Sequence, residues 1–150
     1  MLILHEPLQR QLVYGAILIG ATVLIHAIGQ QVIERCLRRV LPILGGYHAR
    51  YWKFPVVIFL ILGVLGTIWF EISVWALFFY HFSQEAILHS LEAAAYFSIC
   101  SFTTVGFGDV TLTSKWRLLG GFEAAIGMLI FGWSTAFLFE MKALFPKQNQ

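Results

Sequence analysis

The sequence has little charge and few cysteines. Only 12% of its 150 residues are Asp, Glu, Lys or Arg, about half of the roughly 25% that soluble domains carry. A water-soluble enzyme with so few charges would not stay dispersed, so that class is excluded. The two cysteines, Cys36 and Cys100, form no CxxC pair and predict neither a disulfide framework nor a zinc site. A formal net charge of +2 is too small to indicate a nucleic-acid partner.

Long apolar runs occupy most of the chain instead, and hydrophobic residues make up 59% of it. Residues 11–33 hold no Asp, Glu, Lys or Arg, residues 54–80 hold only Glu71, and residues 118–145 are uncharged from 124 to 139. About 20 helical residues cross a bilayer core. We therefore expect an all-α membrane protein with three transmembrane helices. The first run is too long for a signal peptide, and no small-residue cleavage site follows it.

The segment between the second and third runs has a different character. Residues 86–101 predict a short helix with Ser83 as its N-cap, too short and too polar to span a membrane. A loop over residues 103–109, with two glycines separated by one residue, follows directly. This order, with a short helix and a glycine loop between two spans, is the layout of a re-entrant pore. We expect a pore domain over residues 54–150, preceded over residues 1–53 by a transmembrane helix and a basic loop.

The glycine loop suits a dehydrated cation, which needs several oxygens at once in place of its water shell. Consecutive backbone carbonyls provide them only if they point to the same side, which requires left-handed dihedrals at alternate residues. Gly106 and Gly108 alternate with Val105 and Phe107 in this way. One loop cannot encircle an ion, so we expect a homotetramer.

The loop resembles the T-V-G-Y-G signature of potassium channels, with Phe107 in the Tyr position. Together with its flanks, the chain is similar to small bacterial two-transmembrane pore-domain ion channels, with one extra N-terminal helix. The resemblance implies a potassium-selective channel and no cofactor, with K⁺ as the permeant ion. It places K⁺ at the carbonyls of four residues within a filter that ends at Gly108: Thr104, Val105, Gly106 and Phe107.

Phe107 lacks the hydroxyl that the family's Tyr donates. A non-selective monovalent cation channel is therefore the alternative, and a non-conducting regulatory membrane subunit is a further one. The resemblance also implies that Phe107 packs into an aromatic cuff at Tyr96 and Phe97. Cys100 stands where some family members place a Glu behind the filter, and Thr103 is the remaining residue assigned to filter support.

Carboxylates lie near the filter on both sides. Asp109 is expected at the outer mouth, where four copies would form an acidic ring. A hydrogen bond behind the filter is the other interpretation of Asp109. Glu123 lies inside the third apolar run, so we expect a buried acceptor that supports the pore helix or the filter loop.

The third run also carries candidate hinges, Gly127 and Gly132, with close helix packing as the alternative. His26 in the first run is interpreted as a packing histidine, with a pH sensor as the alternative. Lys115 and Arg117 are interpreted as anchors at the membrane interface.

Five basic residues gather between residues 34 and 53. The positive-inside rule places this segment in the cytoplasm, with the N-terminus outside and the C-terminus inside. We expect a multi-pass plasma-membrane protein of a bacterial inner membrane, in contact with membrane lipid. We expect no nucleic acid and no small-molecule substrate. No nucleophile–base pair is visible, so no enzyme is expected.

Overall fold

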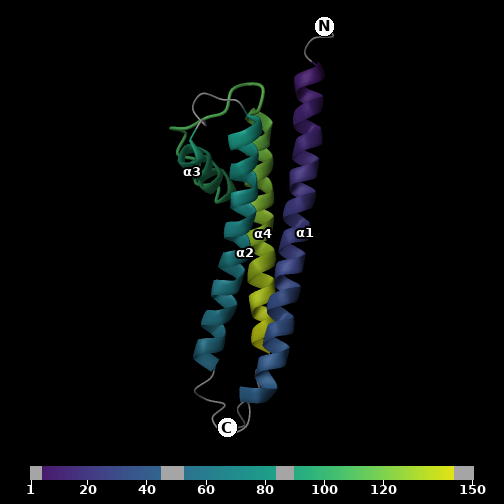
Figure 1. The fold of residues 1–150 in the computed structure, drawn as a ribbon, viewed down its shortest axis with the longest axis vertical. Helices are drawn as coiled ribbons and strands as arrows, with labels where there is room; N and C mark the ends of the chain where they lie inside the picture. The colour runs from purple at the N-terminus through teal and green to yellow at the C-terminus, as the bar shows by residue number, and fades with distance from the viewer. Residues whose placement is uncertain (1–4, 45–52, 84–89, 144–150) are drawn as a thin grey trace.

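The computed structural model describes residues 5–44, 53–83 and 90–143, which form four helices and contain no strand. They are α1 (His5–Leu44), α2 (Lys53–Phe82), α3 (Leu91–Phe102) and α4 (Arg117–Ala143), shown in Figure 1. Three of them, α1, α2 and α4, are long and apolar enough to cross a membrane. The expectation of an all-α membrane protein with three spans is thereby confirmed. The observed bounds of α2 and of the start of α4 lie within two residues of those predicted, and residues 144–145 fall outside the described part.

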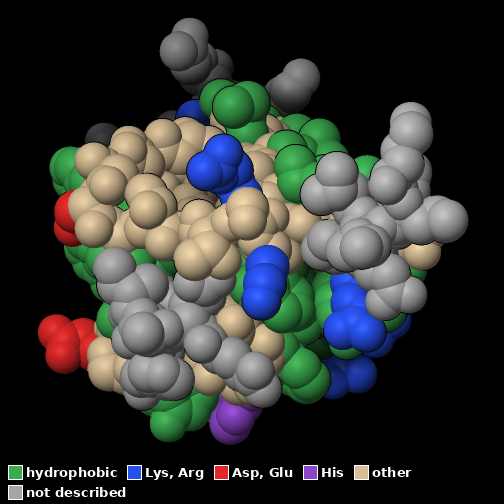
Figure 2. All heavy atoms as spheres, turned by 90° about the horizontal axis from the view of Figure 1, so that it is seen from above, with side chains coloured by type: hydrophobic (Ala, Val, Ile, Leu, Met, Phe, Trp, Pro, Cys, Tyr) green, Lys and Arg blue, Asp and Glu red, His purple; other side chains and the backbone are tan. Residues whose placement is uncertain are grey.

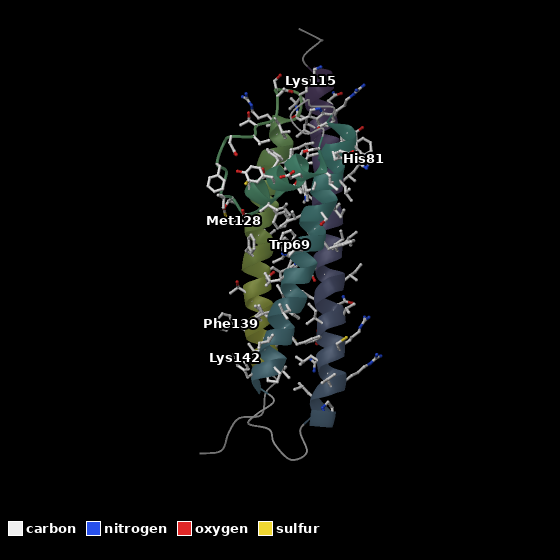
Figure 3. All side chains as sticks on the ribbon, turned by 60° about the vertical axis from the view of Figure 1, so that its left-hand side comes forward. Trp69, His81, Lys115, Met128, Phe139 and Lys142 are labelled. Carbon is white, nitrogen blue, oxygen red and sulfur yellow. The ribbon has the colours of Figure 1, made fainter. Side chains whose placement is uncertain are left out.

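The three long helices run side by side, and α3 stands to one side of them near one end (Figure 1). Helix α3 packs against α2 and α4, and α1 packs against the same two helices. The start of α1 and the loop after α3 lie at one end of the bundle, and the end of α4 lies at the other (Figure 1). Lys115 and Lys142 mark these opposite ends in Figure 3. Lysines at both ends of apolar helices suit contact with lipid headgroups.

Helix α2 supplies more of the bundle core than any other helix. Its buried side chains recur every three or four residues, which is one face of a helix: Val56, Leu60, Val64, Ile68, Ile72, Trp75 and Phe79. Its other faces are also apolar, and Leu62, Trp69 and Phe70 are all more than half exposed. A helix that is apolar all round suits lipid on its outer side.

Helix α1 is longer than the sequence predicted. We expected a helix over residues 11–33 followed by a loop, but the helix continues through 40 residues to Leu44, roughly 60 Å of rise. Leu37 keeps the helical spacing of buried Ile33 and is 1% exposed. The guanidinium of Arg38 lies 2.7 Å from the carboxylate of Glu34, one turn away. The charges that end the apolar run therefore do not end the helix.

Helix α3 begins later than predicted. It starts at Leu91, and its N-cap is Ser90, whose hydroxyl accepts from the Ala93 N–H at 3.0 Å. Ser83, the expected N-cap, instead follows α2 and donates its hydroxyl to the Phe79 carbonyl at 2.6 Å. Both serines therefore lie at a helix boundary, Ser83 at the end of α2 and Ser90 at the start of α3. Residues 86–89 of the expected pore helix lie outside the described residues.

Candidate functional site

The loop expected to form the filter follows α3 directly and is tied back onto its last turn. The Thr103 hydroxyl donates to the Ile99 carbonyl at 2.6 Å. The Thr104 N–H donates to the Ser101 carbonyl at 2.9 Å, and the Gly106 N–H donates to the Cys100 carbonyl at 3.1 Å. These bonds satisfy carbonyls that every helix end leaves open, and they hold the loop close to the C-terminus of α3.

The loop backbone alternates between left-handed and ordinary dihedrals. The φ angles of Thr104, Gly106 and Gly108 are 60°, 54° and 78°, while Val105 and Phe107 have no positive φ. The left-handed backbone expected at both glycines is therefore confirmed. It extends to Thr104, where a β-branched side chain makes it costly, on the order of 1–3 kcal/mol. Positive φ angles at every second residue, counted back from Gly108 and Gly106, would have predicted one at Thr104 as well.

The side chains of this loop are not covered by the rest of the chain. Val105 is 53% exposed and Phe107 is 72% exposed. Phe107 was expected to pack into a cuff of Tyr96 and Phe97, and all three residues line one hollow. Phe97 also packs edge-on against Phe79 of α2, with ring centroids 5.1 Å apart. Packing of Phe107 into the cuff stays a prediction for the assembled pore.

A hollow of about 470 Å³ lies between α3, the loop and the start of α4. Tyr96, Cys100, Phe107, Asp109 and Arg117 are among its lining residues. Viewed from this end of the molecule, Lys and Arg side chains lie on the end face (Figure 2). Lys115 and Arg117 are both exposed, as anchors at the membrane interface would be.

Asp109 is tied to the pore helix. The Tyr96 hydroxyl donates to Oδ2 of Asp109 at 2.8 Å. A hydrogen bond behind the filter was one of the two roles considered for Asp109. The bond to Asp109 is the main cause that raises the pKa of Tyr96 to about 12. Asp109 remains exposed at the same time. Its carboxylate can therefore accept this bond and still present charge to solvent.

Glu123 faces α3 from within the bundle. It is 0% exposed, as is Ser98 on α3. Within the described part of the chain, neither Glu123 oxygen nor the Ser98 hydroxyl has a hydrogen bond of good geometry. The position is that expected for a carboxyl group behind the pore helix. Ser98 was not identified from the sequence, although a serine inside an apolar helix was a usable signal.

The two candidate hinges differ in their surroundings. A Cβ built on Gly127 would overlap the backbone carbonyl of Phe102, at the end of α3. The alternative of close helix packing therefore describes Gly127. A Cβ on Gly132 would meet nothing within 4 Å, so space leaves this residue free to serve as a hinge.

Helix α1 also contacts the segment after the filter loop. The Gln11 side-chain oxygen accepts from the Leu118 N–H at 3.0 Å, and its nitrogen donates to the Ser114 carbonyl at 3.4 Å. Gln11 thus satisfies one of the open N–H groups at the start of α4. Further along α1, His26 is fully buried and lies within hydrogen-bond distance of Glu71 on α2.

Comparison with protein families gives one match. A family model described as ion channel matches residues 57–142, which run from the first turns of α2 through α3 and the loop almost to the end of α4. No curated protein and no solved structure matches the chain. The matched segment contains every element of the site and leaves α1 outside. On this match, which covers more than half of the 150 residues, the chain belongs to the ion channel family.

Proposed function

We propose that the protein is a potassium-selective channel in which four copies surround one axis. The alternating backbone of Thr104, Gly106 and Gly108 carries this proposal. Such an alternation turns successive carbonyls toward one side, whereas a strand points them to opposite sides. Four loops would then stack rings of oxygens at Thr104, Val105, Gly106 and Phe107, which can replace the water shell of K⁺.

The surface of one chain supports a fourfold assembly. The whole loop from residue 104 to residue 109 is exposed, and α4 leaves one face uncovered. The residues of that face recur every three or four positions: Gly121, Ala125, Met128, Gly132, Ala136 and Phe139. Neighbouring subunits and the central cavity would cover this face, and α4 would serve as the inner helix. The hollow beside Phe107 would receive side chains of the next subunit, which would complete the cuff.

The charges of the site favour a cation. The C-terminus of α3, where the helix dipole is negative, leads directly into the loop. Four copies of Asp109 would add an acidic ring at the outer mouth and raise the local concentration of cations. Neither contribution distinguishes K⁺ from Na⁺, so selectivity would come from the carbonyl rings.

A non-selective cation channel remains the second candidate, and Phe107 is the observation that favours it. Its ring cannot donate the hydroxyl hydrogen bond of the family's Tyr, a contribution on the order of 1 kcal/mol. A looser filter would admit Na⁺ as well.

For the orientation, we propose that the loop faces outward and that the far end of the bundle is cytoplasmic. Arg35, Arg38 and Arg39 lie toward that far end of α1, as the positive-inside rule requires. A bacterial inner membrane is the proposed location.

The reversal potential in a planar bilayer tests the proposal, with a K⁺ gradient across the bilayer and an opposite Na⁺ gradient that balances it. A selective channel reverses close to the potassium equilibrium potential. A robust current that reverses near zero would contradict selectivity and establish the second candidate.

A matched pair of alanine variants ties the current to the loop. Gly106→Ala places a side chain at a φ of 54°, whereas a Cβ on the helical Gly66 meets nothing within 4 Å. We expect Gly106→Ala to lower the K⁺ current at least tenfold and Gly66→Ala to leave it unchanged. Equal currents in the two variants would contradict conduction through this loop.

A further inference from the structure

Polar side chains from three helices meet inside the bundle, away from the filter. His26 of α1, Glu71 of α2 and Ser134 of α4 are 0%, 0% and 4% exposed. The imidazole Nδ1 lies 2.8 Å from Glu71 Oε1, and Nε2 lies 3.3 Å from Ser134 Oγ. Gln30, one turn along α1, places its side-chain nitrogen 2.8 Å from the same Nε2. We call His26, Gln30, Glu71 and Ser134 the polar clasp. Trp69, two residues before Glu71, lies near mid-height of the bundle in Figure 3.

Packing alone does not explain the polar clasp. Polar groups inside a membrane bundle are costly, and a buried charge pair is often no more stable than apolar residues of the same volume. The contacts that α1 needs for packing are present elsewhere: Gly15 fits against Phe122 of α4, and Gly29 fits against Thr67 of α2. A polar cluster at this depth therefore indicates a role beyond holding α1 in place.

The hydrogen bonds assign a proton to one side of the ring. The Gln30 amide nitrogen can only donate, so the Nε2 atom that it faces must accept. The ring proton then lies on Nδ1 and is donated to Glu71. The lone pair of Nε2 is shared between two partners, Gln30 on α1 and Ser134 on α4.

A second proton on the ring would change these bonds. Once protonated, Nε2 donates and can no longer accept. Gln30 must then turn its amide oxygen toward the ring, and Ser134 must accept where it had donated. The ring becomes an imidazolium beside the Glu71 carboxylate, so the contact between α1 and α2 strengthens while the contact with α4 is rebuilt.

The α4 side of the polar clasp lies next to the open glycine. Trp133 packs edge-on to the His26 ring, with centroids 5.2 Å apart. Trp133 and Ser134 directly follow Gly132, where a Cβ would meet nothing within 4 Å. A rearranged contact at His26 therefore acts on α4 directly beside the candidate hinge Gly132.

Glu71 is the titratable side chain that faces His26 from α2, and α4 presents only the non-titrating Ser134 and Trp133. The nearest acids of α4 among the described residues, Glu140 and Glu123, are roughly 9 Å and 16 Å away along the helix axis. On α1, Glu34 is roughly 12 Å along the axis. The proton balance of the polar clasp therefore concerns His26 and Glu71.

We infer that the polar clasp is a proton-operated coupling between the N-terminal helix and the inner helix. When His26 takes up a proton, Ser134 changes from hydrogen-bond donor to acceptor, and the equilibrium between open and closed pores shifts. The inference rests on the proposed channel function but not on its selectivity. Histidine is the side chain whose charge ordinarily changes between pH 5 and 8, so the coupling is tested across that range.

Single-channel recordings on the full-length protein from pH 5.5 to pH 8 test the coupling. We expect the open probability of the wild type to change at least threefold, with the single-channel conductance and reversal potential unchanged. His26→Gln keeps a hydrogen-bonding side chain without titration and should remove the pH response. The exposed His81, on the outer end of α2, offers the matched control, and His81→Gln should keep the response. A wild type without pH response, or a response that survives in His26→Gln, overturns the inference.

A second measurement does not depend on current. Nuclear magnetic resonance of ¹⁵N-histidine in lipid bilayers reports protonation of His26 directly. We expect His26 to gain its second proton between pH 5 and 8, and we expect Ser134→Ala to shift the midpoint by at least 0.3 pH units, a twofold change in proton affinity. A ring that does not titrate, or a midpoint that Ser134→Ala leaves unmoved, overturns the inference even if no variant conducts. Absence of current with this shift present would count against the channel proposal alone.

Discussion

At the scale of single residues, the hydrogen bond between Tyr96 and Asp109 carries a pH dependence. It raises the pKa of Tyr96 from 10.0 to about 12. The folded protein thus holds the phenol proton more tightly than the unfolded chain does. The resulting stabilisation is fully present below the unfolded pKa and is lost as the pH rises through the folded pKa.

We therefore expect the melting temperature of the wild type to be flat between about pH 7 and 9 and to fall above about pH 10. Tyr96→Phe removes the titrating hydroxyl and should lack this alkaline step. Thermal melts of both proteins across this pH range provide the measurement. An equally steep alkaline decline in Tyr96→Phe would show that other groups cause it.

Gly127 and Gly132 lie on one helix, and the structure predicts opposite outcomes for them. In Gly127→Ala the new Cβ overlaps the Phe102 carbonyl, and overpacking of this kind costs about 1–3 kcal/mol. In Gly132→Ala the Cβ enters open space, so the fold should keep its stability while bending of α4 becomes harder. Chemical denaturation in detergent measures the first effect, and open probability measures the second. A stable Gly127→Ala protein would argue against the close contact of α3 and α4.

At the scale of elements, the start of α3 depends on one side chain. The Ser90 hydroxyl caps the Ala93 N–H, and loss of such a cap costs about 0.5–2 kcal/mol. We expect Ser90→Ala to speed hydrogen exchange in the first turn of α3, and we expect Ser90→Asp to preserve its protection. Unchanged exchange in Ser90→Ala would mean that packing against α2 and α4 alone defines this end.

The helices show where sequence patterns predict well and where they do not. Both ends of α2 and the start of α4 coincide with the bounds of their apolar runs, so these helix bounds were predicted within two residues. For α1, charged residues end the run, but Leu37 and the Arg38–Glu34 pair continue the helix. Composition indicates where a chain leaves the lipid, whereas a helix ends where its backbone hydrogen bonds stop.

The site likewise has features that the sequence predicts and features that it does not. The left-handed glycines of the loop follow from local backbone chemistry, so the sequence alone predicts them. Phe97 contacts Phe79, Gln11 bonds Leu118 and His26 bonds Glu71, partners that lie 18, 107 and 45 positions away outside their own helices. No local pattern specifies such contacts, and they became visible only in the folded chain.

At the scale of the whole molecule, the proposed pore would bring further copies against the uncovered loop and the uncovered face of α4. We expect native mass spectrometry in detergent to give four times the 17.0 kDa mass of one chain. A bulky substitution on the open face, Ala125→Trp, should reduce the tetramer. Leu62→Trp, on the outward face of α2 where Leu62 is 61% exposed, provides the control. A monomer or dimer for the wild type would exclude a closed fourfold filter.

The polar clasp also bears on how the chain is made. Helix α1 is synthesised before α2 and α4, so the imidazole of His26 is made before its partners on those two helices. Glu71 arrives with α2, the next helix to be inserted, whereas Ser134 arrives only with α4. The pairing of His26 with Glu71 can therefore form in a two-helix hairpin while the rest of the chain is still on the ribosome. His26, which contacts α4 in the folded protein, would then first hold α1 and α2 together while the chain is being assembled.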